Sequence, residues 1–313
     1  MKKYAFGADV GGTTVKMGLF ETDGNLLDTW EIPTDTSNDG AAILPDIAKT
    51  VADKLEEKNI SKDDVEGIGI GVPGPVGNDG TVYKCVNLGW GVINVQQILE
   101  DLTGLRVKAG NDANVAAMGE MWQGGGKGYR SIVMVTLGTG IGGGVIVDGK
   151  IIAGAHGAGG EIGHIPVSDD ETETCGCGKK GCWEQYASAN GFARITKKYL
   201  DENPQVDSVM RKAGSINSKV IFDAAKEGDE AALHMVDELG RLLGRGLATI
   251  SCVADPEAFV LGGGMSKAGN ILTDSIDHYF REYAFHASRS TVITLASLGN
   301  LAGIYGGVGM LLS

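Results

Sequence analysis

The sequence has 313 residues, of which 42% are hydrophobic and 21% charged, and this balance excludes a largely disordered chain. Lys and Arg number 27 against 40 Asp and Glu, so the formal net charge is −13, which argues against a general nucleic-acid binder. The length fits two domains or one large one. The 50 glycines, many of them clustered in apolar stretches, point to ligand-binding loops.

Apolar patterns in the first part of the chain predict an α/β unit. Strands are predicted at 4–10, 15–20, 26–32 and 65–72. A glycine turn at 11–14 joins the first two strands, and apolar residues recur at helical spacing in 39–58. Three strands, a helix and a further strand are typical of an α/β domain.

The strand–glycine turn–strand pattern returns after residue 110. A helix is predicted at 111–122, and strands at 131–137 and 145–147 flank a glycine turn at 138–144. This repetition predicts a duplicated architecture, with the two domains joined at about 109–112. The remaining predicted elements are strands at 150–153 and 258–261 and helices at 190–200, 218–226, 229–252 and 301–312.

The sequence predicts a cytoplasmic protein without a membrane partner. Its first residues include two lysines but lack the continuous apolar stretch of a secretory signal. The longest apolar run, 132–147, is interrupted by glycine and threonine and is shorter than the roughly 18 residues that span a membrane. In the cytoplasm, cysteines clustered within a few residues indicate metal binding rather than disulfides.

Two turns that combine glycine with threonine follow buried strands. Backbone amides and hydroxyls in such turns can hold an anion, although a single turn of this kind is more often merely tight. Two such turns in one chain favour phosphate binding. A dinucleotide loop is not expected, because neither G-x-G-x-x-G match, at 69–74 and 138–143, leads into a helix. Asp9, just before the first turn, either caps it or holds Mg²⁺ near phosphates.

Three cysteines of one glycine-rich loop, with a histidine eleven residues upstream, have the composition of a zinc site. The predicted metal ligands are His164, Cys175, Cys177 and Cys182. Three Cys and one His form a closed tetrahedral set, so this Zn²⁺ is expected to be structural. Glu161 and Glu184 flank the cluster, and two carboxylates beside an imidazole suit a ligand rich in hydroxyls. Taken alone, Glu184 would be interpreted as a solvated surface acid.

Asn111 and Asp112 open the helix predicted at 111–122. Either residue is a typical N-cap. A carboxylate at a domain junction could instead act as a general base on a substrate hydroxyl. The pattern alone leaves both interpretations of Asp112 open.

Taken together, these motifs resemble the ROK sugar kinases over essentially the whole chain. The segments that carry the resemblance are 9–14 and 137–142 as two phosphate motifs, 261–266 as an adenosine motif, and 161–164 with 175–184 as a sugar and zinc signature. The resemblance implies an α/β, actin/hexokinase-like (ribonuclease H-like) fold of two domains with a cleft between them. The smaller domain would be 1–110 plus a returning helix at about 300–313, and the larger domain, 111–299, would carry the zinc loop.

The resemblance also implies an activity, the transfer of a phosphoryl group from ATP to the 6-hydroxyl of a hexose with Asp112 as the general base. Glucose is the expected hexose, as in the bacterial glucokinases of the family, with N-acetylmannosamine or fructose as alternatives. The implied sugar-binding residues are Asn87, Asn111, Asp112, Glu161, His164 and Glu184. The implied residues for ATP and Mg²⁺ are Asp9, Gly11, Gly12, Thr13, Thr14, Gly138, Thr139, Gly140, Gly262, Gly263 and Gly264.

The resemblance further implies a homodimer or tetramer. Transcriptional repressors of the family carry a helix-turn-helix ahead of the kinase-like body, whereas the first phosphate motif here begins at residue 9, so no nucleic-acid partner is expected. A sugar sensor without catalysis is the remaining alternative. It should lack Asp112 or the phosphate turns, and this chain has both.

Overall fold

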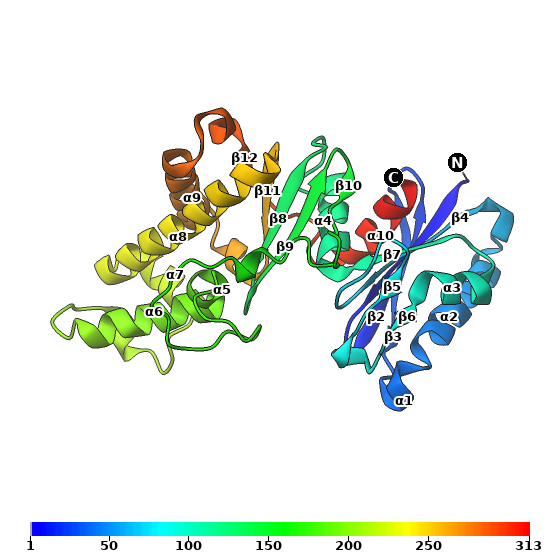
Figure 1. Cartoon of the computed structure of the whole chain (residues 1–313), viewed down its shortest axis with the longest axis horizontal. Coiled ribbons are helices and arrows are strands. Elements are labelled where there is room, and N and C mark those ends of the chain that lie inside the picture. The colour runs from blue at the N-terminus through cyan, green and yellow to red at the C-terminus, as the bar shows by residue number, and fades with distance from the viewer. Residues whose placement is uncertain (1) are drawn as a thin grey trace. The chain divides into compact units, whose positions relative to one another are not determined.

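The computed structural model describes residues 2–313, which divide into two compact units. The first unit contains the residues up to 130 together with 144–160 and 297–313, and the second contains 131–143 and 161–296. Two five-stranded sheets have the strand orders β3-β2-β1-β4-β7 and β10-β9-β8-β11-β12 (Figure 1). Residues 144–160, which include the end of β9 and all of β10, are counted with the first unit.

The two sheets repeat one topology. In the first, β1, β4 and β7 are parallel, and β2 pairs with β3 in antiparallel fashion. In the second, β8, β11 and β12 are parallel, and β9 pairs with β10 in antiparallel fashion. The duplicated architecture predicted from the sequence is therefore confirmed.

The elements of the first unit are strands β1 (Tyr4–Val10), β2 (Thr14–Glu21), β3 (Leu26–Pro33), β4 (Val65–Val72), β5 (Thr81–Val82), β6 (Ile93–Asn94) and β7 (Val107–Asn111), and helices α1 (Ser37–Gly40), α2 (Ile43–Lys58), α3 (Val95–Thr103), α4 (Asp112–Gln123) and α10 (Ala302–Leu312). The remaining elements are strands β8 (Ile132–Leu137), β9 (Ile141–Val147), β10 (Lys150–Ile151), β11 (Ala258–Gly262) and β12 (Val292–Leu295), and helices α5 (Glu184–Ala187), α6 (Ala189–Glu202), α7 (Ser218–Lys226), α8 (Glu230–Ala254) and α9 (Asn270–Tyr283).

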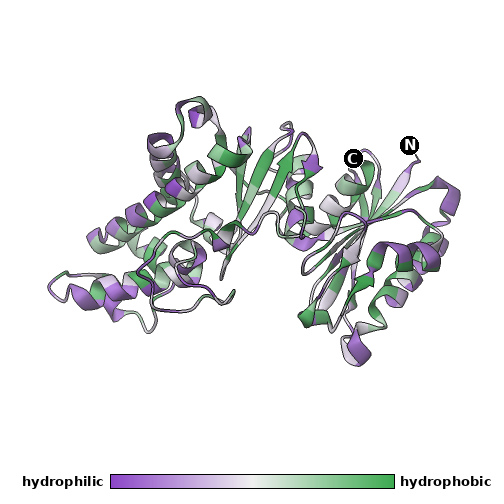
Figure 2. Cartoon of the chain, in the orientation of Figure 1, coloured by the Kyte–Doolittle hydropathy of each residue, from purple (hydrophilic) through white to green (hydrophobic). Residues whose placement is uncertain are grey.

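The first sheet is covered on both faces. Alternate residues of β1, such as Phe6 and Ala8, pack with the apolar side of α2 and α3, while Ala5 packs with α10 on the opposite face. Side chains of a strand alternate between its faces, so a strand buried on both sides is apolar throughout. In the second sheet, β8, β9 and β11 are likewise coloured mainly as hydrophobic in Figure 2.

Glycine brings α10 into direct backbone contact with its neighbours. A Cβ atom on Gly7 would lie 2.0 Å from the carbonyl oxygen of Ile304, and one on Gly306 would lie 1.6 Å from that of Val115. Helix α10 therefore packs closely on both β1 and α4, because glycine has no side chain to hold the backbones apart.

The observed division of the chain differs from the expected boundary at residue 110. Helix α4 lies in the first unit because it packs on α10, and the chain leaves this unit after residue 130. The expected helix at 39–58 begins at Ile43 instead, which places Pro45 in its first turn, where proline costs no helical hydrogen bond. The expected glycine turn at 138–144 ends earlier, since β9 starts at Ile141. Elements α3, α5, α9, β5, β6, β7 and β12 were not predicted.

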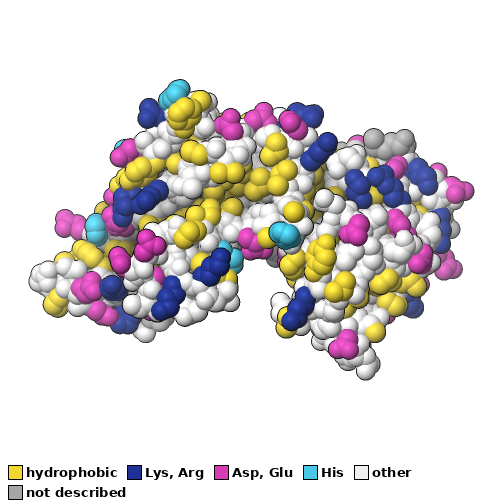
Figure 3. All heavy atoms as spheres, viewed as in Figure 1, with side chains coloured by type: hydrophobic (Ala, Val, Ile, Leu, Met, Phe, Trp, Pro, Cys, Tyr) yellow, Lys and Arg dark blue, Asp and Glu magenta, His cyan; other side chains and the backbone are white. Residues whose placement is uncertain are grey.

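Charged groups are distributed over the surface. Figure 3 shows Asp and Glu side chains interspersed with Lys and Arg on the visible face. Among residues 2–313, no helix combines the length and the apolar character needed to cross a membrane.

Candidate active site

Asp9 is a partly buried acid near the end of β1, opposite Lys16 on β2. Its carboxyl group fits there because residue 303 of α10 is glycine, where a Cβ atom would lie 2.4 Å from Cγ of Asp9. Burial raises the pKa of Asp9 to about 6; the negative charge of Asp112 acts in the same direction, and Lys16 opposes it. A partly buried carboxyl group of this kind suits a bound cation, whose charge would offset the cost of ionisation.

Asn111, at the end of β7, is the N-cap of α4. Its Oδ1 accepts hydrogen bonds from the amides of Ala113 and Asn114, at 3.1 and 3.2 Å. The cap is therefore Asn111, and Asp112 is the first helical residue, so Asp112 is not needed as the cap. Asp112 Oδ1 also accepts from the Ala113 amide, at 2.8 Å. Strand β4 joins the two residues, because Asp9 of β1 pairs with Gly71 and Gly71 pairs with Gly110 of β7, just before Asp112. The two acids therefore lie in one neighbourhood, and the charge of Asp112 helps to raise the pKa of Asp9.

The first glycine–threonine turn is held by hydrogen bonds to β2 and to the residue after β3. The amide of Gly11 donates to the Thr14 carbonyl at 2.9 Å. Thr34 donates through its hydroxyl to the Gly11 carbonyl at 2.7 Å and through its amide to the Thr13 carbonyl at 2.9 Å. Residues 11–14 are exposed, and a Cβ atom on Gly12 would meet nothing within 4 Å among the described residues. Sequence reasoning missed Thr34, because its partners lie in the turn between β1 and β2, about twenty positions earlier in the chain.

Asn87 lies exposed in a short 3-10 turn, Val86–Leu88. Paired backbone hydrogen bonds of 2.9 and 3.0 Å between Cys85 and Trp90 close this turn. Gly74 contacts both the N-cap of α4 and the segment just before this turn. Its carbonyl accepts from Asn111 Nδ2 at 3.0 Å, and a Cβ atom on Gly74 would lie 2.7 Å from the Lys84 carbonyl. The structure thus places Asn87 on a loop that packs against the partners of Asn111.

The second glycine–threonine turn lies in the second unit and packs beside the third glycine motif. The amide of Gly138 donates to the Gly140 carbonyl at 3.0 Å, and the Gly138 carbonyl accepts from the first residue of α6 at 2.8 Å. Gly263 has a φ of +84°, and a Cβ atom there would lie 2.5 Å from the Leu137 carbonyl. Only glycine fits this close approach. Two segments predicted to bind the nucleotide are therefore brought together.

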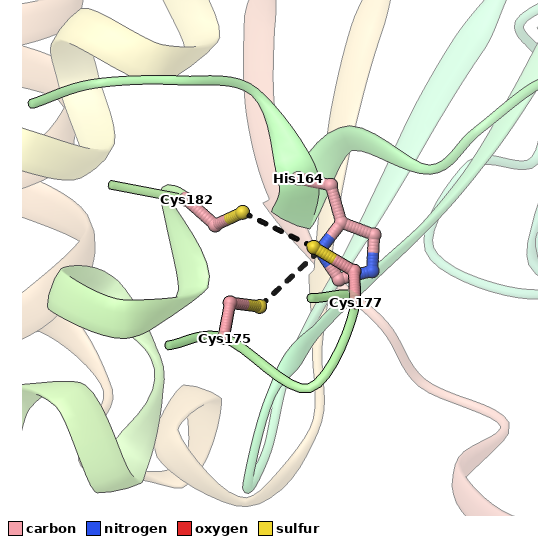
Figure 4. A group of neighbouring side chains, drawn as sticks. All are labelled: His164, Cys175, Cys177 and Cys182. Atoms are coloured by element: carbon pink, nitrogen blue, oxygen red, sulfur yellow. Dashed lines mark hydrogen bonds between the residues drawn. The ribbon is translucent and has the colours of Figure 1, made fainter. Parts of the chain in front are cut away.

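The predicted metal ligands converge at one point (Figure 4). One ligand atom from each of the four side chains lies within 4.8 Å of the others. Cys177 Sγ lies 3.5 Å from Cys182 Sγ, and Cys175 Sγ lies 3.7 Å from His164 Nδ1. In a tetrahedral site with Zn–S bonds of about 2.3 Å, neighbouring ligand atoms are roughly 3.5–3.8 Å apart. The number, kind and spacing of these donors fit Zn²⁺.

The thiol of Cys175 must lose its proton before its sulfur can bind a metal. Burial raises the pKa of this thiol to about 12, and its hydrogen bond to Glu184 acts in the same direction. A protonated thiol does not bind zinc, so metal binding would displace the Cys175 proton.

The ring of His164 lies between two carboxylates. Its Nδ1 is 3.7 Å from Glu184 Oε1 and its Nε2 is 3.8 Å from Glu161 Oε2. If Nδ1 faces the metal cluster, Nε2 is left to hydrogen-bond another group beside Glu161. The convergence of two carboxylates and an imidazole that the sequence predicted is thus present in the second unit.

Contacts on both sides of the cysteine loop hold it in place. Gly181 has a φ of +76°, and a Cβ atom there would lie 1.8 Å from the Ser168 carbonyl. Trp183 is fully buried and donates through its indole N–H to the Leu242 carbonyl at 3.1 Å. These contacts, which need no metal, position the segment that leads into Glu184 at the start of α5.

Two units with one repeated sheet topology, each with a glycine–threonine turn, define a protein of the actin/hexokinase-like fold. The profile of the ROK family matches residues 5–312, and the chain belongs to the ROK family. It is 41% identical to a glucokinase of Halalkalibacterium halodurans over 97% of this chain and 94% of that protein. It is 36% identical to a glucokinase of Streptomyces coelicolor over 96% of this chain and 95% of that protein.

A solved structure shows the same likeness. The ROK family glucokinase of Streptomyces griseus in complex with glucose and AMPPNP matches this chain with a TM-score of 0.71 and 36% identity. The match covers 97% of this chain and 98% of that one.

Proposed function

We propose that this chain is a glucokinase, which transfers the γ-phosphoryl group of ATP to the 6-hydroxyl of glucose. Relatives that match over nearly its whole length are named glucokinases, and a similar structure holds glucose with an ATP analogue. The structural observation that carries the proposal is the pair of carboxyl groups of Asp9 and Asp112, beside an exposed glycine–threonine turn. A base and a cation site close to a phosphate-binding turn are what phosphoryl transfer requires.

In this proposal Asp112 is the general base. Its carboxylate takes the proton of the glucose 6-hydroxyl as that oxygen bonds to the γ-phosphorus, and the bond to the bridging oxygen breaks to release ADP. The Asn111 cap fixes the first turn of α4 and hence the direction of the Asp112 side chain. Asp9 would hold Mg²⁺ directly or through water. When bound, Mg²⁺ supplies charge neutralisation on the phosphates.

Glycine-rich segments of both units are proposed to bind ATP. Gly11, Gly12, Thr13 and Thr14 of the first unit, and Gly138, Thr139 and Gly140 of the second, would bind phosphate oxygens through amides and hydroxyls. Gly262, Gly263 and Gly264 would bind the adenosine. A cavity of about 250 Å³ beside Gly264 and Met265, lined also by Phe222 of α7, gives apolar surface for the base.

The sugar hydroxyls are proposed to bind Asn87, Asn111, Glu161, His164 and Glu184. Carboxylates accept from hydroxyl pairs, and one N–H of the Asn111 amide remains for a sugar oxygen after the other has donated to Gly74. Zn²⁺ held by His164, Cys175, Cys177 and Cys182 would fix the imidazole and the loop that leads to Glu184, a structural role.

The test is a comparison of kcat/KM for Mg²⁺–ATP and five sugars: glucose, mannose, fructose, N-acetylglucosamine and N-acetylmannosamine, with zinc-replete protein. We expect glucose to be the best substrate by at least tenfold. A preference for an acetamido sugar would overturn the proposed substrate and leave the kinase mechanism. Absence of turnover on all five would favour the sugar sensor instead.

The oligomeric state is a separate part of the proposal. We expect a homodimer or tetramer, as the family resemblance implies, with no nucleic-acid partner at a net charge of −13. Light scattering coupled to size-exclusion chromatography would detect a monomer and thereby contradict the first expectation.

A further inference from the structure

Glu184 contacts three parts of the second unit at once. Its Oε1 lies 3.0 Å from Sγ of Cys175, which donates to it only while the thiol is protonated, and 3.7 Å from Nδ1 of His164. Its Oε2 accepts from the amide of Ile141 at 3.3 Å. One carboxylate therefore joins the metal cluster to the end of the second glycine–threonine turn.

The turn is shaped to receive this carboxylate. A Cβ atom on Gly140 would lie 2.5 Å from Glu184 Oε2, so the carboxylate rests where any side chain at residue 140 would project. Two residues earlier the situation differs, because a Cβ atom on Gly138 would approach no described atom more closely than 4.0 Å. Neither glycine has a positive φ, so space rather than backbone conformation distinguishes the two positions.

From this geometry we infer that Glu184 is a positioning residue that couples the sugar pocket to the nucleotide turn, so that glucose and ATP each increase the affinity for the other. The inference rests on the proposed function, in which Glu184 binds sugar hydroxyls and residues 138–140 bind phosphate. A sugar that holds Glu184 against Gly140 also holds the turn, through the Ile141 amide. The nucleotide then binds a turn that is already ordered, and less conformational entropy is lost.

Coupling of this kind is reciprocal. If bound nucleotide tightens glucose binding by some factor, bound glucose tightens nucleotide binding by the same factor. The inference predicts a factor of at least about fivefold in the wild-type protein, within the usual range for coupled sites. It also predicts that a substitution on the nucleotide turn weakens glucose binding when no nucleotide is present. Two independent subsites would not behave in this way.

The experiment measures the Kd of glucose by calorimetry, with and without Mg²⁺–AMPPNP, for wild type, Gly140→Ala and Gly214→Ala. We expect Gly140→Ala to weaken glucose binding without nucleotide at least tenfold, because the added methyl displaces Glu184. Gly214→Ala is the matched control, because this exposed glycine of the second unit has room for a Cβ atom and no proposed role, and its glucose Kd should remain within twofold of wild type. An unchanged glucose Kd in Gly140→Ala would overturn the inference.

A double-mutant cycle separates displacement of Glu184 from general damage to the turn. Glu184→Asp shortens the side chain and leaves room for the methyl group, so adding Gly140→Ala to Glu184→Asp should change the glucose Kd by less than threefold. If the losses of glucose affinity caused by Gly140→Ala and Glu184→Asp simply add in the double variant, the inferred coupling is also overturned. If the protein binds another of the five sugars in place of glucose, the same variants are compared with that sugar, and only the proposed substrate is wrong. If wild type binds none of them, the proposed function and this inference both fail.

Discussion

Asp9 and Asp112 act on one another electrostatically although 103 positions separate them in the chain. Asp9 lies next to the last residue of a strand that α10 covers, and Asp112 begins the helix that packs on the same α10. One helix thereby brings the proposed cation ligand and the proposed base into one neighbourhood. Both carboxyl groups are expected to be ionised during catalysis, so the arrangement costs stability when no cation is bound.

Replacement of Asp9 by Asn should stabilise the protein at neutral pH. The pKa of Asp9 is about 6 in the folded state and near its ordinary value of 3.8 when unfolded, so the folded state binds the proton more tightly. Tighter proton binding by Asp9 in the folded state adds to the free energy of unfolding, and this contribution is fully present below about pH 4 and is lost as the pH rises through 6. The free energy of unfolding of Asp9→Asn should therefore exceed that of wild type at pH 7.5 by up to about 3 kcal/mol, and the two should differ little near pH 4. Urea denaturation without nucleotide or Mg²⁺ measures this.

The exposed Asp53 of α2 provides a matched control for that experiment, since Asp53→Asn should change stability little at either pH. A gain from Asp9→Asn of equal size at both pH values would contradict the electrostatic explanation. Activity of Asp9→Asn should fall despite the added stability, because the ligand for the cation is lost.

Asp112→Asn should remove catalysis and preserve the fold. The amide oxygen of Asn can still accept from the Ala113 amide, as Asp112 does at 2.8 Å, so the start of α4 is retained. General bases contribute about 10²- to 10⁴-fold to rate, and kcat should fall by that amount with little change in the Tm. Steady-state kinetics and a thermal melt check both points. A kcat near that of wild type would exclude Asp112 as the base.

Cys177→Ser should release the metal. Cys177 Sγ lies 3.5 Å from Cys182 Sγ, and loss of one of four ligands from a closed tetrahedral site greatly weakens zinc binding. We expect zinc content to fall from about one per chain to below about 0.2, with a lower Tm and a higher KM for glucose. Cys252→Ser, at an exposed cysteine outside the cluster, is the control. Equal zinc content in both variants would refute the site.

Glu120→Gln should destabilise the first unit. Glu120 is 0% exposed, and its carboxylate accepts from the amides of Gly125, Ser297 and Leu298 at 2.8, 3.0 and 2.9 Å. Gln replaces one acceptor oxygen with an N–H₂ group that faces a donor, so a cost of about 2–4 kcal/mol is expected. Chemical denaturation measures the loss of unfolding free energy in Glu120→Gln and compares it with that in Glu57→Gln, a substitution at an exposed position. Equal stability of the two variants would show that these hydrogen bonds contribute little.

The sequence by itself determined the local structure and the cluster of three cysteines and one histidine. The strands at 4–10 and 65–72 and the helix at 218–226 were predicted with the observed bounds, because runs of apolar residues and helical spacing act over neighbouring positions. The four ligands of the cluster were recognisable for a related reason, since three of them share one short loop. The glycine–threonine turns were visible as residue types, although the second proved shorter than predicted.

Only the tertiary structure decided which distant residues meet. The effect of Asp112 on Asp9 and the hydrogen bonds from Ser297 and Leu298 to Glu120 join segments more than 100 positions apart, and no local pattern encodes them. The contact of Glu184 with Gly140 likewise depends on how the cysteine loop packs against the start of β9. Backbone propensity acts between neighbours along the chain, whereas these contacts depend on the close approach of packed elements.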